Sequence, residues 1–527
     1  MTGLQEPGTL RGHESPHPLF KGGIIVSDQT HQAGFLHRFI QHAQEHPDAL
    51  ALHALDERRQ ISYAELHEMA CRRKSVLTGL GLAPRSRVML CLPSGVEFVA
   101  NYLGAVGGDF IPILINDKLT GQEFATLARD ARAAAIITTS AFAQKHAKTL
   151  TSLEDLQSLV TVDAGTPPEL REGITRVGLP GADAIAQALT LPDKDTIVTV
   201  QYTYKGVGEP LPVAHRYQAL TISSDGLLAS MYPMGVGSVH LISLPLYAVY
   251  GLVVLMVMPL SIGATMLMTS SITRTDLVEL LSKHRVTFAC LVPELIRMLS
   301  AQLAERSAPL PPLMPDLMLY SGGSRLTAEA ALELEQRLVR PKILQGYGMT
   351  ESLPVIVQSY VGTSKPGAIG QAIPGVKVRV VDDHGDNVAP GDVGELLLSG
   401  PTITSGYIDR PAATARFFSG GWLHTGDLVR MDADGHIFFA GSRLRITKIR
   451  SQMVDLAEVE RVAGEHPGVR LVRAYAERDA QGQTSLQLSV HCDGASSESL
   501  MAHLTERLSP FKLPRSISAV DQAMATA

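Results

Sequence analysis

The chain has 527 residues, which is too long for a single hydrophobic core, so more than one domain is expected. Hydrophobic residues make up 45% of the chain and charged residues 19%, the balance of an ordinary globular protein. The formal net charge of −6 offers no basic footprint, which argues against nucleic acid and anionic membranes as partners.

The N-terminus and the cysteines point to a reducing compartment. Residues 1–30 are rich in Gly, Pro and His and lack the apolar stretch of a signal peptide, so we expect a loose N-terminal tail. The cysteines have neither CxxC nor metal-ligand spacing: Cys71, Cys91, Cys290 and Cys492. Free thiols predict a cytoplasmic location.

Beyond the tail, strands are expected to alternate with helices. The spacing of Phe35 and Phe39 predicts an amphipathic helix that ends at His46-Pro47. Ser62 and Glu65 have the spacing of a capping box at the start of the next helix. Buried strands are predicted at 49–52, 87–92, 134–139, 197–202, 239–244, 264–268, 288–291 and 317–321. This alternation is typical of βαβ units on parallel sheets.

One long apolar stretch needs an explanation. No Asp, Glu, Lys or Arg occurs from Gly226 to Thr273, a length that also suits a membrane span. Pro245, Gly251 and Pro259 interrupt it at short intervals. Strands and helices buried in a parallel α/β core give the same pattern, so we predict core and no membrane span.

Two motifs in the second half carry the chemistry. The run Leu344–Ser352 contains two glycines, followed by the hydroxyl of Thr350 and the carboxylate of Glu351, a pair suited to a phosphate oxygen and its Mg²⁺. Further on, Gly421-Trp422-Leu423-His424-Thr425-Gly426-Asp427 precedes another apolar strand. Together these motifs resemble the adenylate-forming (ANL) superfamily of acyl- and aryl-CoA synthetases, peptide-synthetase adenylation domains and luciferases.

The resemblance implies an α/β fold in two domains. A large N-terminal domain, 31–440, would contain two doubly wound sheets and a small β-barrel at about 355–440. A small, shortened α/β domain, 441–527, would follow a hinge near Gly441 and rotate between adenylation and thioester formation.

The resemblance also implies the site. Asp427 would hold the ribose hydroxyls of a nucleotide, Thr350 a phosphate, and Glu351 a metal only if Mg-ATP is bound; no resident metal is predicted. The cofactor-binding set is Gly322, Gly323, Ser324, Tyr347, Gly348, Asp427 and Lys448. The acyl pocket set is Tyr247, Ala248, Tyr250, Gly251, Gly346 and Met349.

The sequence departs from the family pattern in the segment that should hold the phosphates. Tyr204 and Val207 replace small hydroxylated residues of the phosphate loop, and Leu211 replaces its lysine. Lys205 could supply charge from a different place. In the hinge motif, Leu444 replaces a charged pivot, and Ser442, Ser451 and Met453 replace an Arg, a Gly and an Arg. The family's C-terminal catalytic lysine has no counterpart in the sequence, and Lys512 is not its equivalent.

These departures favour a first hypothesis in which ATP and Mg²⁺ are not used. An acyl or aryl group would move between a CoA thioester and the phosphopantetheine of a holo acyl carrier protein in secondary metabolism, with His424 and His215 as candidate bases. The alternative is a divergent AMP-forming acyl- or aryl-CoA synthetase that requires ATP. The third is a catalytically silent homologue that binds a ligand or partner. The acyl group, the oligomeric state and the pathway cannot be read from the sequence.

Overall fold

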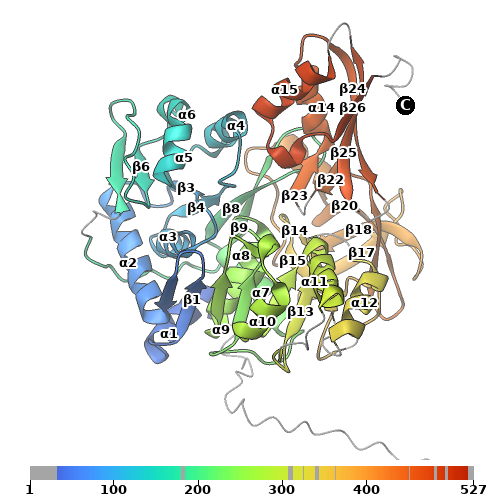
Figure 1. Cartoon of the computed structure of the whole chain (residues 1–527), viewed down its shortest axis with the longest axis horizontal. Helices are drawn as coiled ribbons and strands as arrows, with labels where there is room; N and C mark the ends of the chain where they lie inside the picture. The colour runs from blue at the N-terminus through green and yellow to red at the C-terminus, as the bar shows by residue number, and fades with distance from the viewer. Residues whose placement is uncertain are drawn as a thin grey trace, which may run out of the picture.

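The computed structural model describes residues 33–179, 184–306, 312–323, 326–338, 343–362, 364–449, 452–479, 483–492 and 496–519. The predicted tail 1–30 and the end of the chain from 520 lie outside these ranges. Within them, the chain forms a mixed α/β protein with a large N-terminal part and a smaller C-terminal part, coloured red in Figure 1.

The first large sheet is parallel except at one edge. Its strand order is β7 (Thr175–Gly178), β6 (Ser158–Thr161), β5 (Ala135–Thr138), β3 (Arg87–Cys91), β4 (Ile111–Leu114), β8 (Ile197–Thr203) and β9 (Leu211–Arg216). Every residue of β5 and β6 is buried, which explains their continuous apolar sequence. β9 runs antiparallel at the edge, where Pro212 removes no hydrogen bond needed by a further strand.

The second large sheet is parallel at its centre and antiparallel at both ends. Its strand order is β16 (Gln371–Ala372), β15 (Leu353–Val357), β14 (Ile343–Met349), β13 (Met318–Ser321), β12 (Phe288–Leu291), β10 (Val239–Ile242), β11 (Thr265–Met268), β1 (Leu50–Ala54) and β2 (Arg59–Ser62). The strands predicted from apolar runs are therefore confirmed, with ends that differ by one or two residues.

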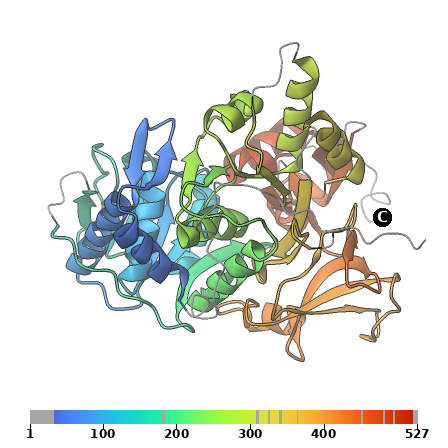
Figure 2. The same cartoon turned by 90° about the horizontal axis from the view of Figure 1, so that it is seen from below.

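Helices accompany both sheets (Figures 1 and 2). They are α1 (Phe35–Glu45), α2 (Tyr63–Gly79), α3 (Val96–Gly107), α4 (Gly121–Ala131), α5 (Ser140–Lys145), α6 (Ala147–Ser152), α7 (Tyr217–Leu228), α8 (Val249–Leu252), α9 (Met258–Ile262), α10 (Leu277–Lys283), α11 (Pro293–Glu305) and α12 (Ala328–Leu338), with short helical turns at Val253–Val257 and Ile272–Arg274. The predicted capping box begins α2: the Glu65 backbone donates to Ser62 Oγ at 3.2 Å, and the Ser62 backbone donates to Glu65 Oε2 at 2.7 Å.

The long apolar stretch belongs to the core, as predicted. It forms β10, α8, the helical turn Val253–Val257, α9 and β11, and residues 251–262 are all buried. No helix in the described ranges combines the length and the apolar character that a membrane span requires.

An antiparallel sheet follows, seen at the lower right of Figure 2. It contains β17 (Lys377–Val381), β18 (Val393–Ser399), β19 (Phe418–Ser419), β20 (Trp422–Met431) and β21 (Ile437–Ser442), with α13 (Pro411–Phe417) before β19. β20 pairs with β18, β19 and β21, so it is the central strand.

The C-terminal part begins with a hairpin of β22 (Ile446–Ile449) and β23 (Gln452–Asp455). α14 (Leu456–Gly464), β24 (Val469–Arg478), β25 (Thr484–Cys492), α15 (Ser497–Arg507), a turn of 3-10 helix at Pro510–Lys512 and β26 (Ser516–Ala519) follow. This part touches the large part where α15 lies beside α4 (Figure 1), and Thr120 donates to the carbonyl of Arg507 at 3.0 Å. The domain boundary near Gly441 stays a prediction.

Candidate active site at the junction of the two parts

The first part of the candidate site lies where β14 and β20 meet. Tyr347, on β14, donates a hydrogen bond to Asp427 Oδ2 on β20 at 2.7 Å. Burial raises the pKa of Tyr347 well above its ordinary value, and the charge of Asp427 adds to the shift. Tyr347 therefore remains a donor that fixes the Asp427 carboxylate. We call this pair, together with Gly322, Gly323 and Lys448, the nucleoside end of the site.

Lys448 reaches this end from the small C-terminal part. Its Nζ donates to the carbonyl of Gly323 in the large part. Burial lowers the pKa of Lys448, and the nearby charge of Asp427 opposes that shift. The same hairpin contributes Gln452, whose Oε1 accepts from Tyr247 at 3.4 Å. The hairpin β22–β23 therefore covers the site, and two predicted residues, Lys448 and Tyr247, take part in the contact.

The predicted acyl pocket is packed with tyrosine rings. A Cβ on Gly322 would lie 2.2 Å from the Tyr250 ring, and a Cβ on Gly346 would lie 2.7 Å from Tyr320. Gly251 packs as closely on the carbonyl of Pro245, and Ala248 begins α8. These glycines admit neighbouring groups that any side chain would exclude. Gly348 does the same for the turn into β15, because a Cβ there would lie 2.3 Å from the carbonyl of Leu353.

Glu351 is fully buried and already neutralised. Its Oε1 accepts from the Tyr407 hydroxyl at 2.7 Å and lies 3.6 Å from Lys205 Nζ. Lys205 also donates to the carbonyl of Thr425 at 3.1 Å and lies 3.7 Å from Met349 Sδ, a residue predicted for the acyl pocket. Thr350, the other half of the predicted phosphate motif, is half-buried next to it.

The loop between β8 and β9 is the predicted phosphate loop, and its groups are bound by the small part. The backbone N–H of Gly208 donates to Asp455 Oδ2 at 3.2 Å. Gly206 has a φ of +72°. It lies so close to the small part that a Cβ would be 2.9 Å from the backbone nitrogen of Arg445. The Tyr204 hydroxyl lies 3.3 Å from Lys512 Nζ. We call this loop and the Lys205–Glu351 pair the phosphate end.

Lys512 is the centre of a buried ionic cluster that joins the two parts. Its Nζ lies 2.8 Å from Glu123 Oε1 on α4 and 2.7 Å from Glu458 Oε2 on α14. Burial acts to raise the pKa of both carboxyl groups and Lys512 acts to lower it. The pKa of Glu123 is lowered because Lys512 prevails, whereas the pKa of Glu458 is raised because burial prevails. Sequence reasoning did not find this cluster.

Three apolar replacements noted in the sequence lie in one cluster. Leu211 is buried with Val213, Tyr407 and Phe417, and Val207 and Leu444 pack against this group. Leu211 and Val207 come from the phosphate end and Leu444 from the hinge. Leu211, predicted to stand at the lysine position of the loop, is therefore part of a small core, in which a charge would be costly.

The two candidate bases lie in different surroundings. His424, on β20, is partly exposed, with its Nδ1 3.8 Å from Glu395 Oε2. His215, on β9, is 1% exposed, and burial lowers its pKa to about 3. Burial of this kind argues against proton exchange with a ligand at His215. Ser324 and Ser451 lie outside the described residues.

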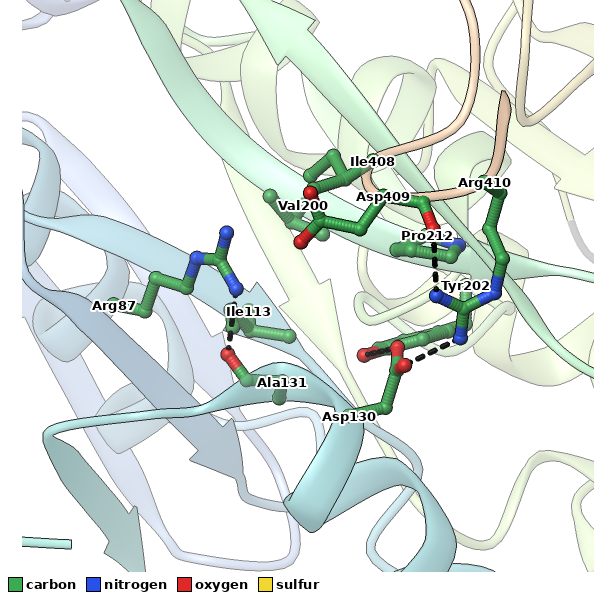
Figure 3. Close-up of a pocket in the computed structure, with 10 residues that line it drawn as sticks. All are labelled: Arg87, Ile113, Asp130, Ala131, Val200, Tyr202, Pro212, Ile408, Asp409 and Arg410. Atoms are coloured by element: carbon green, nitrogen blue, oxygen red, sulfur yellow. Dashed lines mark hydrogen bonds and ion pairs between the residues drawn. The ribbon is translucent and has the colours of Figure 1, made fainter. Parts of the chain in front are cut away.

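Polar residues that line a small pocket next to the phosphate end hold the β8–β9 hairpin (Figure 3). Asp130, at the end of α4, accepts from the Tyr202 hydroxyl at 2.7 Å and pairs with Arg410. This contact ties the base of the hairpin to the segment after Tyr407 and so holds the loop in place.

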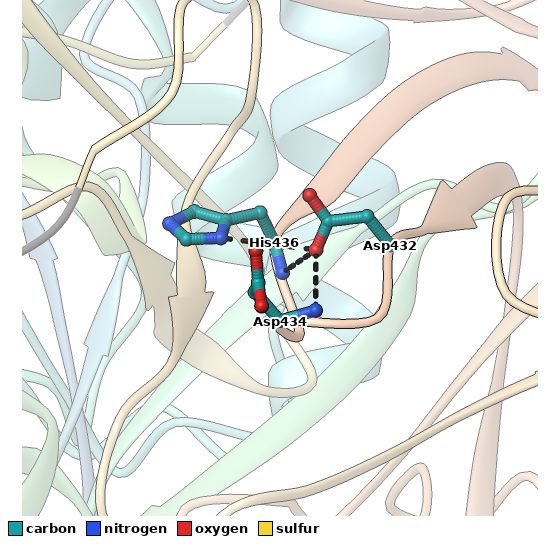
Figure 4. Close-up of side chains that lie close together, drawn as sticks. All are labelled: Asp432, Asp434 and His436. Carbon is teal, nitrogen blue, oxygen red and sulfur yellow. Dashed lines mark hydrogen bonds and ion pairs between the residues drawn. The ribbon is translucent and has the colours of Figure 1, made fainter.

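A group of acidic side chains elsewhere resembles a metal site but contains a lysine ammonium. Asp432, Asp434 and His436 lie close together beside β21 (Figure 4). Lys365 Nζ lies 2.6 Å from a carboxylate oxygen of both aspartates. The charge that a cation would supply is therefore already present.

Comparison with known proteins identifies the family. The model of the AMP-binding enzyme family matches residues 39–408. The chain belongs to this family.

Several curated relatives are aryl-CoA ligases and match most of the chain. The 4-hydroxybenzoate–CoA/benzoate–CoA ligase of Rhodopseudomonas palustris is 27% identical over 89% of this chain and 87% of its own length. The benzoate–CoA ligase of Thauera aromatica is 27% identical over 90% of each. The 4-coumarate–CoA ligase 2 of Solanum tuberosum is 28% identical over 83% of this chain and 81% of its own length.

Solved structures share the fold. The o-succinylbenzoate CoA synthetase of Bacillus subtilis superposes with a TM-score of 0.79 at 21% identity, covering 92% of this chain and 95% of its own. An amide bond synthetase of Marinactinospora thermotolerans also gives 0.79, at 22% identity and with 93% and 96% covered.

Proposed function

We propose that this protein is an AMP-forming ligase that joins an aromatic carboxylic acid to coenzyme A. The observation that carries the proposal is the nucleoside end, where Tyr347 fixes the Asp427 carboxylate at 2.7 Å beside the covering Lys448. A carboxylate is a natural acceptor for the two hydroxyls of a ribose. The curated relatives support the substrate class, because their names specify benzoate, 4-hydroxybenzoate and 4-coumarate.

The reaction would take place in two steps, adenylation of the acid and formation of the thioester. A carboxylate oxygen of the acid attacks the α-phosphorus of ATP, and pyrophosphate leaves. The thiol of CoA, after losing its proton, then attacks the acyl carbon, and AMP leaves with the carboxyl oxygen. Lys448, which donates to the carbonyl of Gly323, would stabilise negative charge that develops at this end.

The assay is direct. Purified protein is incubated with ATP, Mg²⁺, CoA and, in turn, benzoate, 4-hydroxybenzoate, 4-coumarate and ferulate. We expect stoichiometric AMP and aryl-CoA with at least one acid, measured by chromatography and mass spectrometry. Absence of AMP with every aromatic acid, from folded protein, would refute the proposal.

A second candidate function, transfer of an acyl or aryl group from CoA to a carrier-protein phosphopantetheine without ATP, is favoured by the phosphate end. There the Gly208 N–H is bound to Asp455, Tyr204 meets Lys512, and Lys205 pairs with Glu351. Thioester exchange needs none of these groups for a nucleotide. Benzoyl-CoA mixed with a holo carrier protein and no nucleotide would then increase the mass of the carrier by one acyl group. An unchanged carrier mass would exclude this candidate for that acyl group.

A further inference from the structure

Lys205 and Glu351 form a buried ion pair in the position where the family motif predicts a metal ligand. The side chains are 2% and 0% exposed, and Lys205 Nζ lies 3.6 Å from Glu351 Oε1. The carbonyl of Thr425, at 3.1 Å, and the ring of Phe417, whose centroid is 5.1 Å away, complete the surroundings of the ammonium. The Tyr407 hydroxyl donates to the same carboxylate oxygen.

A divalent cation does not fit beside this oxygen. Mg²⁺ requires oxygen ligands at about 2.0–2.1 Å in octahedral geometry. Glu351 Oε1 is already taken by the Tyr407 hydroxyl, and an ammonium lies next to it. Only Oε2 has no hydrogen-bond partner among the described residues. Mg²⁺ bound to a single carboxylate keeps several waters, and the fully buried Glu351, with an ammonium beside it, offers those waters no open space.

The side chains of the pair and their partners all belong to the large part. Lys205, Glu351, Tyr407 and Thr425 all precede the predicted hinge. By contrast, the contacts of Gly208 and Tyr204 are made to Asp455 and Lys512 of the small part and would be lost if it rotated away. The misfit with a metal at Glu351 is therefore built into the large part alone.

We propose that the ammonium of Lys205 permanently replaces the divalent cation at Glu351. The Lys205–Glu351 pair has a net charge of zero. A Mg²⁺ ion bound to the carboxylate would give a net charge of plus one. This end of the site is thus suited to ligand groups of low charge, such as a carboxylate or a thioester carbonyl. A polyphosphate would receive its countercharge from outside Glu351. The proposal holds for either candidate function, because it concerns the protein without substrates.

The test measures the binding of Mn²⁺, a spectroscopic stand-in for Mg²⁺, to the full-length protein without nucleotide or CoA. Electron paramagnetic resonance counts bound Mn²⁺ in the wild type and in Glu351→Gln. We expect equal counts, because Glu351 holds no metal in the wild type. Any Mn²⁺ bound by Asp432, Asp434 and His436 is the same in both proteins and does not affect the difference between the two counts. A site in the wild type that Glu351→Gln removes would overturn the proposal.

Lys205→Ala provides the second arm. Removal of the ammonium leaves space and an unpaired carboxylate, so we expect one additional Mn²⁺ and a Tm that rises by a few degrees with millimolar Mg²⁺, a response absent from the wild type. The double variant Lys205→Ala/Glu351→Gln should lose both effects. A folded Lys205→Ala protein that gains no Mn²⁺ would also overturn the proposal. If this variant fails to fold, the comparison of the wild type with Glu351→Gln still decides.

Discussion

The nucleoside end and the phosphate end meet at the segment Tyr347–Glu351, yet they differ in how they are built. At the nucleoside end, Asp427 and Tyr347 hold each other and face a lysine from the small part. At the phosphate end, the polar groups of the loop are bound by the protein itself, and Leu211, predicted to stand at the lysine position of the loop, is buried.

Several residues predicted to depart from the family pattern lie in contact in the structure. Leu444 lies far from Val207 and Leu211 in the sequence, but the three pack in one cluster. Tyr204 likewise meets Lys512. Isolated losses of polar ligands would leave buried groups without partners, at a cost of about 1–3 kcal/mol each. Here the replacements form contacts with one another, so the phosphate end is a packed junction between the two parts.

The largest expected effect tests how far the junction depends on Lys512. Lys512→Met leaves Glu123 and Glu458 buried without their cation, and breaking such a cluster costs about 3–5 kcal/mol. We expect this loss in urea unfolding, together with faster proteolysis between the two parts. Lys377→Met, which changes an exposed lysine on β17, is the control. Equal stability of the two variants would mean that Lys512 does not hold the junction.

The next effect concerns the nucleoside end. If this end binds the ribose, Asp427→Ala removes charge-assisted hydrogen bonds of about 1.5–3 kcal/mol each, so kcat/KM for AMP formation should fall about 100-fold. Asp392→Ala, an exposed carboxylate before β18, should change kcat/KM less than about twofold. A similar decrease of kcat/KM in both variants would mean that Asp427 has no specific role in AMP formation.

The sequence predicted the parts of the fold that depend on local patterns. Apolar runs located eight strands, although the buried β6 and β15 were not among them, and the spacing of Ser62 and Glu65 predicted a capping box that the structure confirms. Both signals are set by neighbouring residues. The contacts of Lys205 and Lys512 escaped prediction because their partners lie far away along the chain. The strand β9 was also missed, since Pro212 and the preceding loop motif pointed to an extended phosphate loop. Long-range pairing of charges leaves no periodic signal in the sequence.

The next effect concerns His215, the buried histidine that follows the phosphate loop. His215, on the strand that leaves the phosphate loop, has a pKa of about 3 because it is buried, whereas an unfolded histidine titrates near 6.5. Its neutral form is favoured in the folded protein, so its contribution is fully present above pH 6.5 and is lost as the pH falls from 6.5 towards 3. Between pH 7.5 and pH 5 the loss is about 2 kcal/mol.

Thermal unfolding across this pH range measures the loss. His215→Gln should reduce the decrease in stability on acidification by about 2 kcal/mol, although it lowers stability at pH 7.5. His240→Gln is the matched variant, because burial also lowers the pKa of His240, on β10, to about 3. An unchanged pH dependence in both variants would show that neither ring is held neutral.

The smallest expected effect tests whether Asp455 keeps anions out of the phosphate loop. Asp455 accepts from the Gly208 N–H and also from the backbone of Ala457 and Glu458 at the start of α14. Asp455→Asn retains a good helix cap but removes the charge, so the stability should change by less than about 0.5 kcal/mol. Without the negative charge, the affinity for ATP should rise about fivefold, equivalent to about 1 kcal/mol. Asp276→Asn, at the cap of α10, is the control for capping alone. Isothermal titration with ATP distinguishes the cases: equal affinities in the two variants would mean that the loop is blocked by its packing and not by the carboxylate of Asp455.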